Sequence, residues 1–321
     1  MSAVSAAWSG AGASVRGAQH RRCGMPNQDA IGWWRPPAMD PGAAAGTARA
    51  TADGAADDTA GDTAHSAAHL VAVEGDLLAA AVADGHGHPR GVRADVGARL
   101  AVATALDLVA ASYPGLRAPE AAHRLLDDLP ARIPALWSER VASDLAAHPL
   151  GEDDLERAVA GEGPAARAAL EHDPAIAYGT TVILVAATPE HLLVAQLGDG
   201  DVLVAGRRGA LRRPLRKDPE LVANRTWSLA SPDASRHFET AFVPHDLTTE
   251  LVLAATDGYA NSYRDPSGFD QVASDMLAMV RDHGMALLAR SLPHWLESTS
   301  EQGSGDDITV AVLARTGGTR P

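Results

Sequence analysis

Cysteine and aromatic residues are scarce in this chain of 321 residues. Cys23 is the only cysteine, so no disulfide can form within the chain, and this is typical of proteins from reducing compartments. Aromatic residues make up 4% of the composition, although hydrophobic residues make up 46%. We therefore expect cores built mainly from alanine, valine and leucine.

Long hydrophobic runs are also missing from the sequence. The longest apolar stretches, at about 70–82 and 176–187, are interrupted and shorter than the ~20 residues that a membrane-spanning helix needs. The first ten residues contain no basic segment followed by an apolar one, so we identify no signal peptide there. These absences predict a cytoplasmic protein that does not associate with membranes.

Positive charge is in deficit, because the formal net charge is -14. Nucleic-acid binding depends on a basic surface, so we expect no nucleic-acid partner. Phosphorylated substrates remain compatible with this charge, since a carboxylate-rich site that has bound cations can hold a phosphate.

Residues 36–68 are almost entirely Ala, Gly, Asp, Thr and Pro without apolar periodicity, and we interpret them as a disordered insertion. The flanking segments Ala30–Trp34 and Leu70–Ala83 are typical of strands that pair across it. Glu74–Asp76 indicates a hairpin turn between two strands of the second segment. We do not interpret the insertion as a domain linker, and we expect a single domain over residues 1–321.

The remaining periodicity predicts a helical block flanked by strands. The predicted helices cover residues 91–111, 119–147 with interruptions at Pro130 and Pro134, 151–172, and about 269–296. The predicted strands cover residues 180–187, 192–197 and 202–205, which we expect to pair consecutively, and then 251–255 and 308–314. This order indicates an α+β fold with antiparallel sheet and helices in separate layers.

Four aspartates occur where an apolar strand meets a tight turn: Asp84, Asp199, Asp257 and Asp306. Strand ends hold side chains rigidly, so we expect these carboxylates to converge on one cleft. Converging carboxylates repel one another unless cations are bound, and hard oxygen ligands favour Mg²⁺ or Mn²⁺. Two ions about 3.5–4 Å apart can bind a phosphate and activate a water for in-line attack. One such aspartate alone is more often a turn former, so the prediction depends on all four.

Asp84-Gly85-His86-Gly87-His88 is the densest of these signals. The glycines allow close approach of the backbone, so the Gly85 carbonyl can join Asp84 as a ligand. His86 is our candidate general acid for the departing alkoxide, because histidine titrates near neutrality. A zinc site that includes His86 and His88 is the lower-ranked alternative, since no HExxH or CxxC motif accompanies them, and plain surface positions are another.

Six motifs in order resemble the metal-dependent protein phosphatases of the 2C type, with features of a bacterial branch. They are Asn27-Gln28-Asp29, Asp84-Gly85-His86-Gly87, Tyr178-Gly179-Thr180-Thr181, Leu197-Gly198-Asp199-Gly200, Ala255-Thr256-Asp257-Gly258 and Asp306-Asp307-Ile308-Thr309-Val310. The resemblance implies a four-layer αββα sandwich, in which two antiparallel β-sheets are flanked by helices.

The same resemblance implies two cations, Mn²⁺ or Mg²⁺, and assigns their ligands. Asp84 would bridge the two ions, the Gly85 carbonyl would join it, and Asp257 and Asp306 would hold one of them. The remaining positions are Asp29, in or just behind the ligand set, and Asp199, which corresponds to the site of an additional, weaker third ion.

One residue that the family uses to contact phosphate is missing from this sequence. The family often carries a phosphate-gripping Arg where Gly24 stands, and an acidic residue where Gln28 stands. Arg22 or His20 can replace that Arg, because a guanidinium offers two contacts to phosphate and an imidazolium offers one. The basic segment 207–217 is most simply a solvated hairpin, with docking of acidic partners as the alternative.

The predicted function is hydrolysis of phosphoserine or phosphothreonine in proteins by a metal-activated water, on substrates of a serine/threonine kinase. A cysteine nucleophile is not expected, because Cys23 is followed by Gly24-Met25-Pro26-Asn27, which lacks the Arg of a phosphate-binding loop. Two alternatives stay open: a catalytically weak regulatory protein that binds phosphoproteins, and a hydrolase of small phosphoesters.

Overall fold

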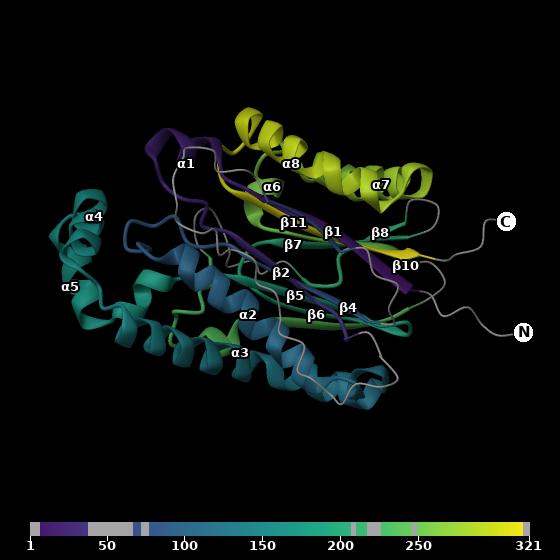
Figure 1. Cartoon of the computed structure of the whole chain (residues 1–321), viewed down its shortest axis with the longest axis horizontal. Coiled ribbons are helices and arrows are strands. Elements are labelled where there is room, and N and C mark those ends of the chain that lie inside the picture. The colour runs from purple at the N-terminus through teal and green to yellow at the C-terminus, as the bar shows by residue number, and fades with distance from the viewer. Residues whose placement is uncertain are drawn as a thin grey trace, which may run out of the picture.

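The computed structural model describes residues 7–37, 67–71, 77–206, 210–216, 226–245 and 249–316. Two antiparallel sheets lie face to face in the middle of the molecule, and helices cover both outer faces (Figure 1). This is the predicted four-layer αββα arrangement of an α+β fold. Most of the predicted insertion at 36–68, and the predicted turn at Glu74–Asp76, lie outside the described residues.

Six strands form the first sheet among the described residues. In spatial order they are β3 (Ala67–Val71), β1 (Ala7–Val15), β11 (Ile308–Thr316), β10 (Thr249–Ala255), β7 (Asp201–Gly206) and β8 (Leu211–Arg212). β1 pairs with β11 over its whole length, from Ala7 opposite Thr316 to Val15 opposite Ile308. The first and last described strands of the chain are therefore neighbours.

Five described strands form the second sheet. In spatial order they are β2 (Ala30–Trp34), β4 (Leu78–Ala83), β5 (Val182–Ala187), β6 (His191–Leu197) and β9 (Glu239–Pro244). β2 pairs with β4, with Ala30 opposite Ala83, which confirms the predicted pairing across the insertion.

Two predicted strand pairings are wrong, for one physical reason. β3 and β4 do not form a hairpin, because they lie in different sheets, and β6 and β7 are also divided between the sheets. The described strands at these connections are apolar on both faces, with all six side chains of β4 and all six of β7 buried. A pattern without alternation does not tell which of two stacked sheets a strand joins.

Helices α2 (Ala94–Ser112) and α3 (Pro119–Ala147) cover the second sheet, and α7 (Pro266–His283) and α8 (Met285–Gln302) cover the first (Figure 1). The prediction that Pro130 and Pro134 interrupt the helix at 119–147 is wrong, because α3 is continuous through both. Its buried side chains continue at helical spacing on both sides of the prolines, so packing outweighs the local cost.

The prediction of a single helix at about 269–296 is also wrong, because α7 ends and α8 begins around Gly284. Gly284 has a φ of 83°, in the left-handed region that favours glycine and that no helix interior contains. The chain can therefore turn between two amphipathic helices that both pack on the first sheet.

Three hydrophobic cores correspond to the three contacts between the four layers. One lies between α2, α3 and the second sheet, one between the first sheet and α7 and α8, and the third between the two sheets. Trp33 and Trp34 are both buried, because one faces the inter-sheet core and the other faces α2. Alanine, valine and leucine dominate all three cores, as the composition predicted.

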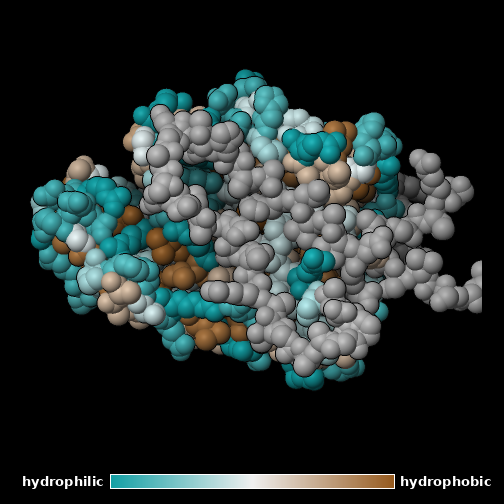
Figure 2. Space-filling model, in the orientation of Figure 1, coloured by the Kyte–Doolittle hydropathy of each residue, from teal (hydrophilic) through white to brown (hydrophobic). Residues whose placement is uncertain are grey.

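A helical hairpin, α4 (Glu152–Glu162) and α5 (Pro164–His172), projects at one end of the molecule (Figure 1). Its surface is mainly hydrophilic in Figure 2, and the exposed side chains of α4 include Glu152, Asp153, Glu156 and Arg157. Within the described residues, none of the helices has the length and apolar character that crossing a membrane would require.

Trp137 provides a test of the packing of α3 on α2. It is 1% exposed and its Nε1 donates to the carbonyl of Gly97 at 3.0 Å. We expect Trp137→Ala to lower the free energy of unfolding by about 3–5 kcal/mol, and Trp137→Phe by less because the ring volume is largely kept. Urea denaturation measures both. Arg132→Ala, at an exposed position of the same helix, serves as the control, and a loss below about 1 kcal/mol for Trp137→Ala would contradict the packing.

Candidate active site

Five aspartates meet at one end of the sandwich because of the strand registers. Asp84 follows β4, Asp29 precedes β2, and Asp199 lies between β6 and β7. Asp257 begins the short helix α6 (Asp257–Ala260) directly after β10, and Asp306 precedes β11. Antiparallel pairing brings each of these strand ends next to the others, as with Ala83 opposite Ala30 and Ala255 opposite Asp201.

The carboxylates of Asp84, Asp199 and Asp257 form the tightest group. One oxygen atom of each lies within 4.8 Å of the others. Asp306 lies close by but outside this group, with its Cβ 3.2 Å from the position that a Cβ on Gly258 would take. Asp199, which the sequence ranked below Asp84, Asp257 and Asp306, is therefore more central than expected.

Mutual repulsion and burial disturb the ionisation of the group. Burial raises the pKa of Asp84 well above its usual value, and the charges of Asp29 and Asp257 raise it further. Burial and the charge of Asp199 raise the pKa of Asp257 to about 6. Burial likewise raises the pKa of Asp29 and of Asp306. These directions show carboxylates that lack sufficient compensating positive charge.

This donor set fits hard divalent cations. The strongest charge interactions of Asp84 and Asp257 are with other aspartates and not with a described lysine or arginine. Carboxylate oxygens without thiolate partners favour Mg²⁺ or Mn²⁺ over zinc. Cations bound there would remove the repulsion between the aspartates, so the carboxylate oxygens are suited to such ions.

The start of β5 holds the backbone of Asp84. Its N–H donates to Thr181 Oγ1 at 3.0 Å, and its carbonyl accepts from the Thr181 N–H at 2.9 Å and from Thr180 Oγ1 at 2.8 Å. Gly85 lies so close to β2 that a Cβ there would stand 2.5 Å from the carbonyl oxygen of Gln28. The motifs around Asp84 and Thr180 therefore form one rigid unit, and the proposed role of the Gly85 carbonyl stays a prediction.

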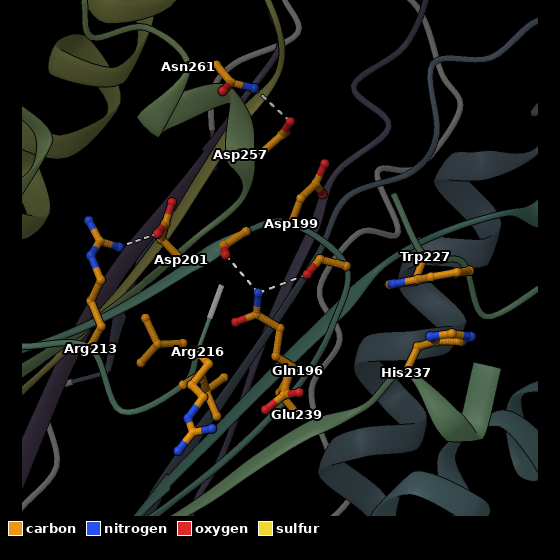
Figure 3. A pocket seen from close by; sticks show the side chains of 14 residues that line it. Gln196, Asp199, Asp201, Arg213, Arg216, Trp227, His237, Glu239, Asp257 and Asn261 are labelled. Atoms are coloured by element: carbon orange, nitrogen blue, oxygen red, sulfur yellow. Dashed lines mark hydrogen bonds and ion pairs between the residues drawn. The ribbon is translucent and has the colours of Figure 1, made fainter. Parts of the chain in front are cut away.

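Asp199 is presented by the turn that carries the chain from one sheet to the other. The Gln196 amide nitrogen donates to the carbonyls of Gly198 and Gly200 at 3.0 and 2.7 Å (Figure 3). Thr226 Oγ1 donates to Asp199 Oδ1 at 2.8 Å. Asp201 follows on β7 but points to Arg213, with which it forms an ion pair. Asp201 therefore does not add its charge to the crowded group.

The basic segment 207–217 is in part the predicted solvated hairpin, because β8 pairs with β7 and Arg212 and Arg216 are exposed. Arg213 pairs with Asp201 and also with Asp270 of α7 at 2.5 Å, and Arg212 Nη2 donates to Thr249 Oγ1 at 2.7 Å. Two of its arginines thus join β8 to neighbouring elements. Arg207, Arg208 and Lys217 lie outside the described residues.

Asp307 is a site residue that the sequence analysis quoted but did not assign. It is 3% exposed, and its carboxylate accepts from the N–H groups of Gly17 and Gln28, both at 2.6 Å, and from His20 Nδ1 at 2.9 Å. It therefore ties the loops on either side of α1 (Ala18–Cys23) to the start of β11. The doubled Asp306-Asp307 was the available signal, but nothing in the sequence distinguishes their directions.

Thr256 is a second missed contact and fixes Asp29. Its Oγ1 donates to Asp29 Oδ2 at 2.8 Å and accepts from the Thr309 N–H at 2.9 Å. Thr256 therefore links Asp29 to the start of β11, and the expected place of Asp29 in or just behind the ligand set stays a prediction.

The candidate general acid, His86, and the two candidate phosphate contacts, His20 and Arg22, lie in different surroundings. Burial lowers the pKa of His86 to about 4, and its ring packs on Gly179, with Cδ2 2.9 Å from the position of a Cβ there. The hydrogen bond to Asp307 raises the pKa of His20. Arg22 is exposed, with Nη2 3.9 Å from the position of a Cβ on Gly305, which precedes Asp306.

The fold and the carboxylate group together define an αββα sandwich with an acidic cluster, suited to divalent cations, at one end. The sequence model of the protein phosphatase 2C family matches residues 57–297, which is more than half of the chain. The chain therefore belongs to the protein phosphatase 2C family, and the resemblance noted from the motifs is confirmed. Among curated proteins, no sequence matches at a significant level.

Solved structures of similar arrangement include three bacterial proteins. The serine/threonine phosphatase PstP/Ppp of Mycobacterium tuberculosis is 17% identical, with 96% of this chain and 98% of that chain covered and a TM-score of 0.46. Stp1 of Staphylococcus aureus is 13% identical (75% and 85% covered, TM-score 0.47). PppA of Pseudomonas aeruginosa, described as a key regulatory component of T6SS, is 20% identical (74% and 86% covered, TM-score 0.45).

Asp257→Asn tests the crowding of the carboxylates. The substitution removes one charge, so in the presence of a chelator we expect the free energy of unfolding at neutral pH to rise by roughly 1–3 kcal/mol. We expect added Mn²⁺ to raise the melting temperature of the unmodified protein more than that of the variant. Thermal unfolding with and without Mn²⁺ measures both effects.

The matched control for this test is Asp128→Asn, at an exposed position of α3 away from the group. It should change neither quantity. A chelated Asp257→Asn protein that is less stable than the unmodified chain would contradict the repulsion argument.

Proposed function

We propose that this chain is a metal-dependent phosphatase that hydrolyses phosphoserine and phosphothreonine in proteins. The observation that carries the proposal is the group formed by Asp84, Asp199 and Asp257, with oxygen atoms within 4.8 Å, in a member of the protein phosphatase 2C family. The ions would be two Mn²⁺ or Mg²⁺, with Asp199 as a ligand of a third.

Asp84, Asp257 and Asp306 would hold the two principal ions, with the Gly85 carbonyl beside Asp84 and with Asp29 just behind. When bound, such ions supply positive charge for the phosphate and lower the pKa of a water molecule. The chain itself contributes orientation: Thr180 and Thr181 fix Asp84 by three hydrogen bonds, and Thr256 fixes Asp29. Preorganised carboxylates avoid rearrangement during the reaction, which favours in-line attack.

His20 and Arg22 would supply the phosphate contact that Gly24 cannot make. His20 is held by Asp307 at 2.9 Å, and this hydrogen bond favours the charged imidazolium. Arg22 reaches the vicinity of Gly305 from the exposed face of α1. An imidazolium held by Asp307, or an exposed guanidinium near Gly305, would be suited to contact a phosphate oxygen.

His86 would donate the proton that the departing alkoxide of Ser or Thr requires. Burial lowers the pKa of His86 to about 4, so the ring is neutral at pH 7 in the free protein, and it would act as a general acid only where a bound phosphate stabilises the imidazolium. The Nε2 atom is buried and has no hydrogen-bond partner among the described residues, so the ring would have to become accessible before a substrate oxygen could accept from it.

The proposal extends to the setting of the reaction. The substrate would be a phosphorylated protein made by a serine/threonine kinase, and the protein would act in the cytoplasm. Neither nucleic acid nor membrane is a proposed partner.

Hydrolysis of a phosphothreonine peptide in the presence of Mn²⁺ tests the function. We expect Asp84→Ala and Asp257→Ala each to lower the rate at least about 100-fold, because each removes a ligand. A chelator should abolish the activity, and Asp128→Ala should leave it unchanged. Activity that persists in both aspartate variants would overturn the mechanism, and hydrolysis of small phosphoesters without peptide hydrolysis would favour a small-molecule phosphoesterase instead.

The role of His86 is tested by comparing two leaving groups. We expect His86→Asn to lower kcat for a phosphothreonine peptide roughly 100-fold, because the alkoxide must be protonated. The loss for para-nitrophenyl phosphate should be less than about tenfold, since its phenolate leaves without a proton. Steady-state kinetics on both substrates decide the point. Equal losses on the two substrates would exclude His86 as the general acid.

A further inference from the structure

A cavity of about 320 Å³ opens directly beside the carboxylate group (Figure 3). Asp199 and Asp257 belong both to the group and to the wall of the cavity. A phosphate held at the group would therefore lie against this wall. The side chains next to the phosphorylated residue of a bound peptide would then be within reach of the cavity, because neighbouring residues of an extended chain are about 3.3–3.6 Å apart.

Trp227 enters the cavity wall from a segment that is fastened to the site on both sides. Thr226 Oγ1 donates to Asp199 Oδ1 at 2.8 Å. Ser228 Oγ accepts from the Thr180 N–H at 3.2 Å, and the Leu229 N–H donates to the Thr180 carbonyl at 2.9 Å. Trp227 thus lies between one residue that is hydrogen-bonded to Asp199 and another that is hydrogen-bonded to Thr180, so its backbone position is set by the site itself.

The Trp227 ring is oriented by a stacked histidine. The ring centroids of Trp227 and His237 are 3.4 Å apart and the planes are inclined by 14° (Figure 3). His237 is in turn held by Asp233, whose Oδ2 lies 3.1 Å from His237 Nε2. Because each ring covers one face of the other, the stack gives the cavity an aromatic wall made of ring edges and outer faces, and the direction of this wall is fixed before any ligand arrives.

Most charged side chains of the cavity wall already form ion pairs or belong to the carboxylate group. Arg213 forms ion pairs with Asp201 and Asp270, so its guanidinium is already bound. Of the other charged residues that line the cavity, Asp199 and Asp257 belong to the carboxylate group, which leaves Arg216 and Glu239 with opposite signs. The aromatic wall is therefore the feature that distinguishes one ligand side chain from another.

On the basis of the proposed function, we propose that this cavity is a specificity site that binds an aromatic side chain adjacent to the phosphorylated residue of a peptide substrate. The side chain packs against the aromatic wall of the Trp227–His237 stack, while the phosphate lies at the carboxylate group and its cations. Trp227 acts as a specificity-determining residue and takes no part in the chemical step.

The test compares phosphothreonine peptides that are identical except for Phe or Ala immediately before, or immediately after, the phosphorylated residue. Affinity is measured by calorimetry with Mn²⁺ on peptides that carry a non-hydrolysable phosphonate, and turnover is measured on the phosphate peptides and on free phosphothreonine. We expect the Phe peptide of one series to bind roughly three- to tenfold more tightly than its Ala counterpart.

Trp227→Ala should remove this preference and leave the turnover of free phosphothreonine within about threefold, whereas Trp227→Phe should keep most of the preference. Trp295→Ala, which removes another half-buried tryptophan in α8, is the matched control and should keep it. If Trp227→Ala does not fold, Trp227→Leu decides instead, because leucine keeps the apolar bulk without the flat ring.

The outcomes separate this inference from the proposed function. Equal affinities of the Phe and Ala peptides for the unmodified protein, or a preference that survives in Trp227→Ala, would overturn the specificity site even if the peptides are hydrolysed. A preference that depends on Trp227, observed without any hydrolysis, would support the specificity site and overturn the proposed activity.

Discussion

Repulsion between half-buried carboxylates is the interaction on which the rest of this structure depends. Asp84, Asp199 and Asp257 are brought together by backbone turns at the ends of different strands, and the raised pKa values of Asp84 and Asp257 express the electrostatic cost of that position. Carboxylates stay in such an unfavourable arrangement only where the surrounding structure holds them there. The two stacked sheets provide this, because the strand ends that carry the aspartates cannot move apart without breaking paired strands.

Hydrogen-bond donors around the carboxylate group bind the other acidic side chains at this end of the molecule. Asp307 and Asp201 are carboxylates of the same end of the molecule, yet each is satisfied by donors: backbone N–H groups and His20 in one case, Arg213 in the other. The chain therefore separates carboxylates that are neutralised by basic side chains or backbone N–H groups from the crowded group that is suited to cations. This division explains how one end of the sandwich can hold so many acidic side chains and still fold.

The same end of the molecule combines chemistry with recognition. The turn from Gly198 to Gly200 carries Asp199, changes sheets and borders the cavity, so the proposed phosphate position and the aromatic wall share one piece of backbone. Thr226 and Ser228 fasten Trp227 to that unit. Membership of the protein phosphatase 2C family accounts for the carboxylates, whereas the stack of Trp227 on His237 is a feature read from this structure.

The sequence by itself determined the α+β class, the pairing of β2 with β4, and the aspartates at strand ends, because these depend on local patterns: apolar runs, turns and the residues next to them. Only the tertiary structure decided which sheet β3 and β7 join, since a short apolar run without regular alternation does not point to one sheet. It also decided that Asp199 stands with Asp84 and Asp257 while Asp307 turns to Gly17, Gln28 and His20. Adjacent aspartates have the same chemistry in a sequence, and only the packing of distant segments gives them different partners.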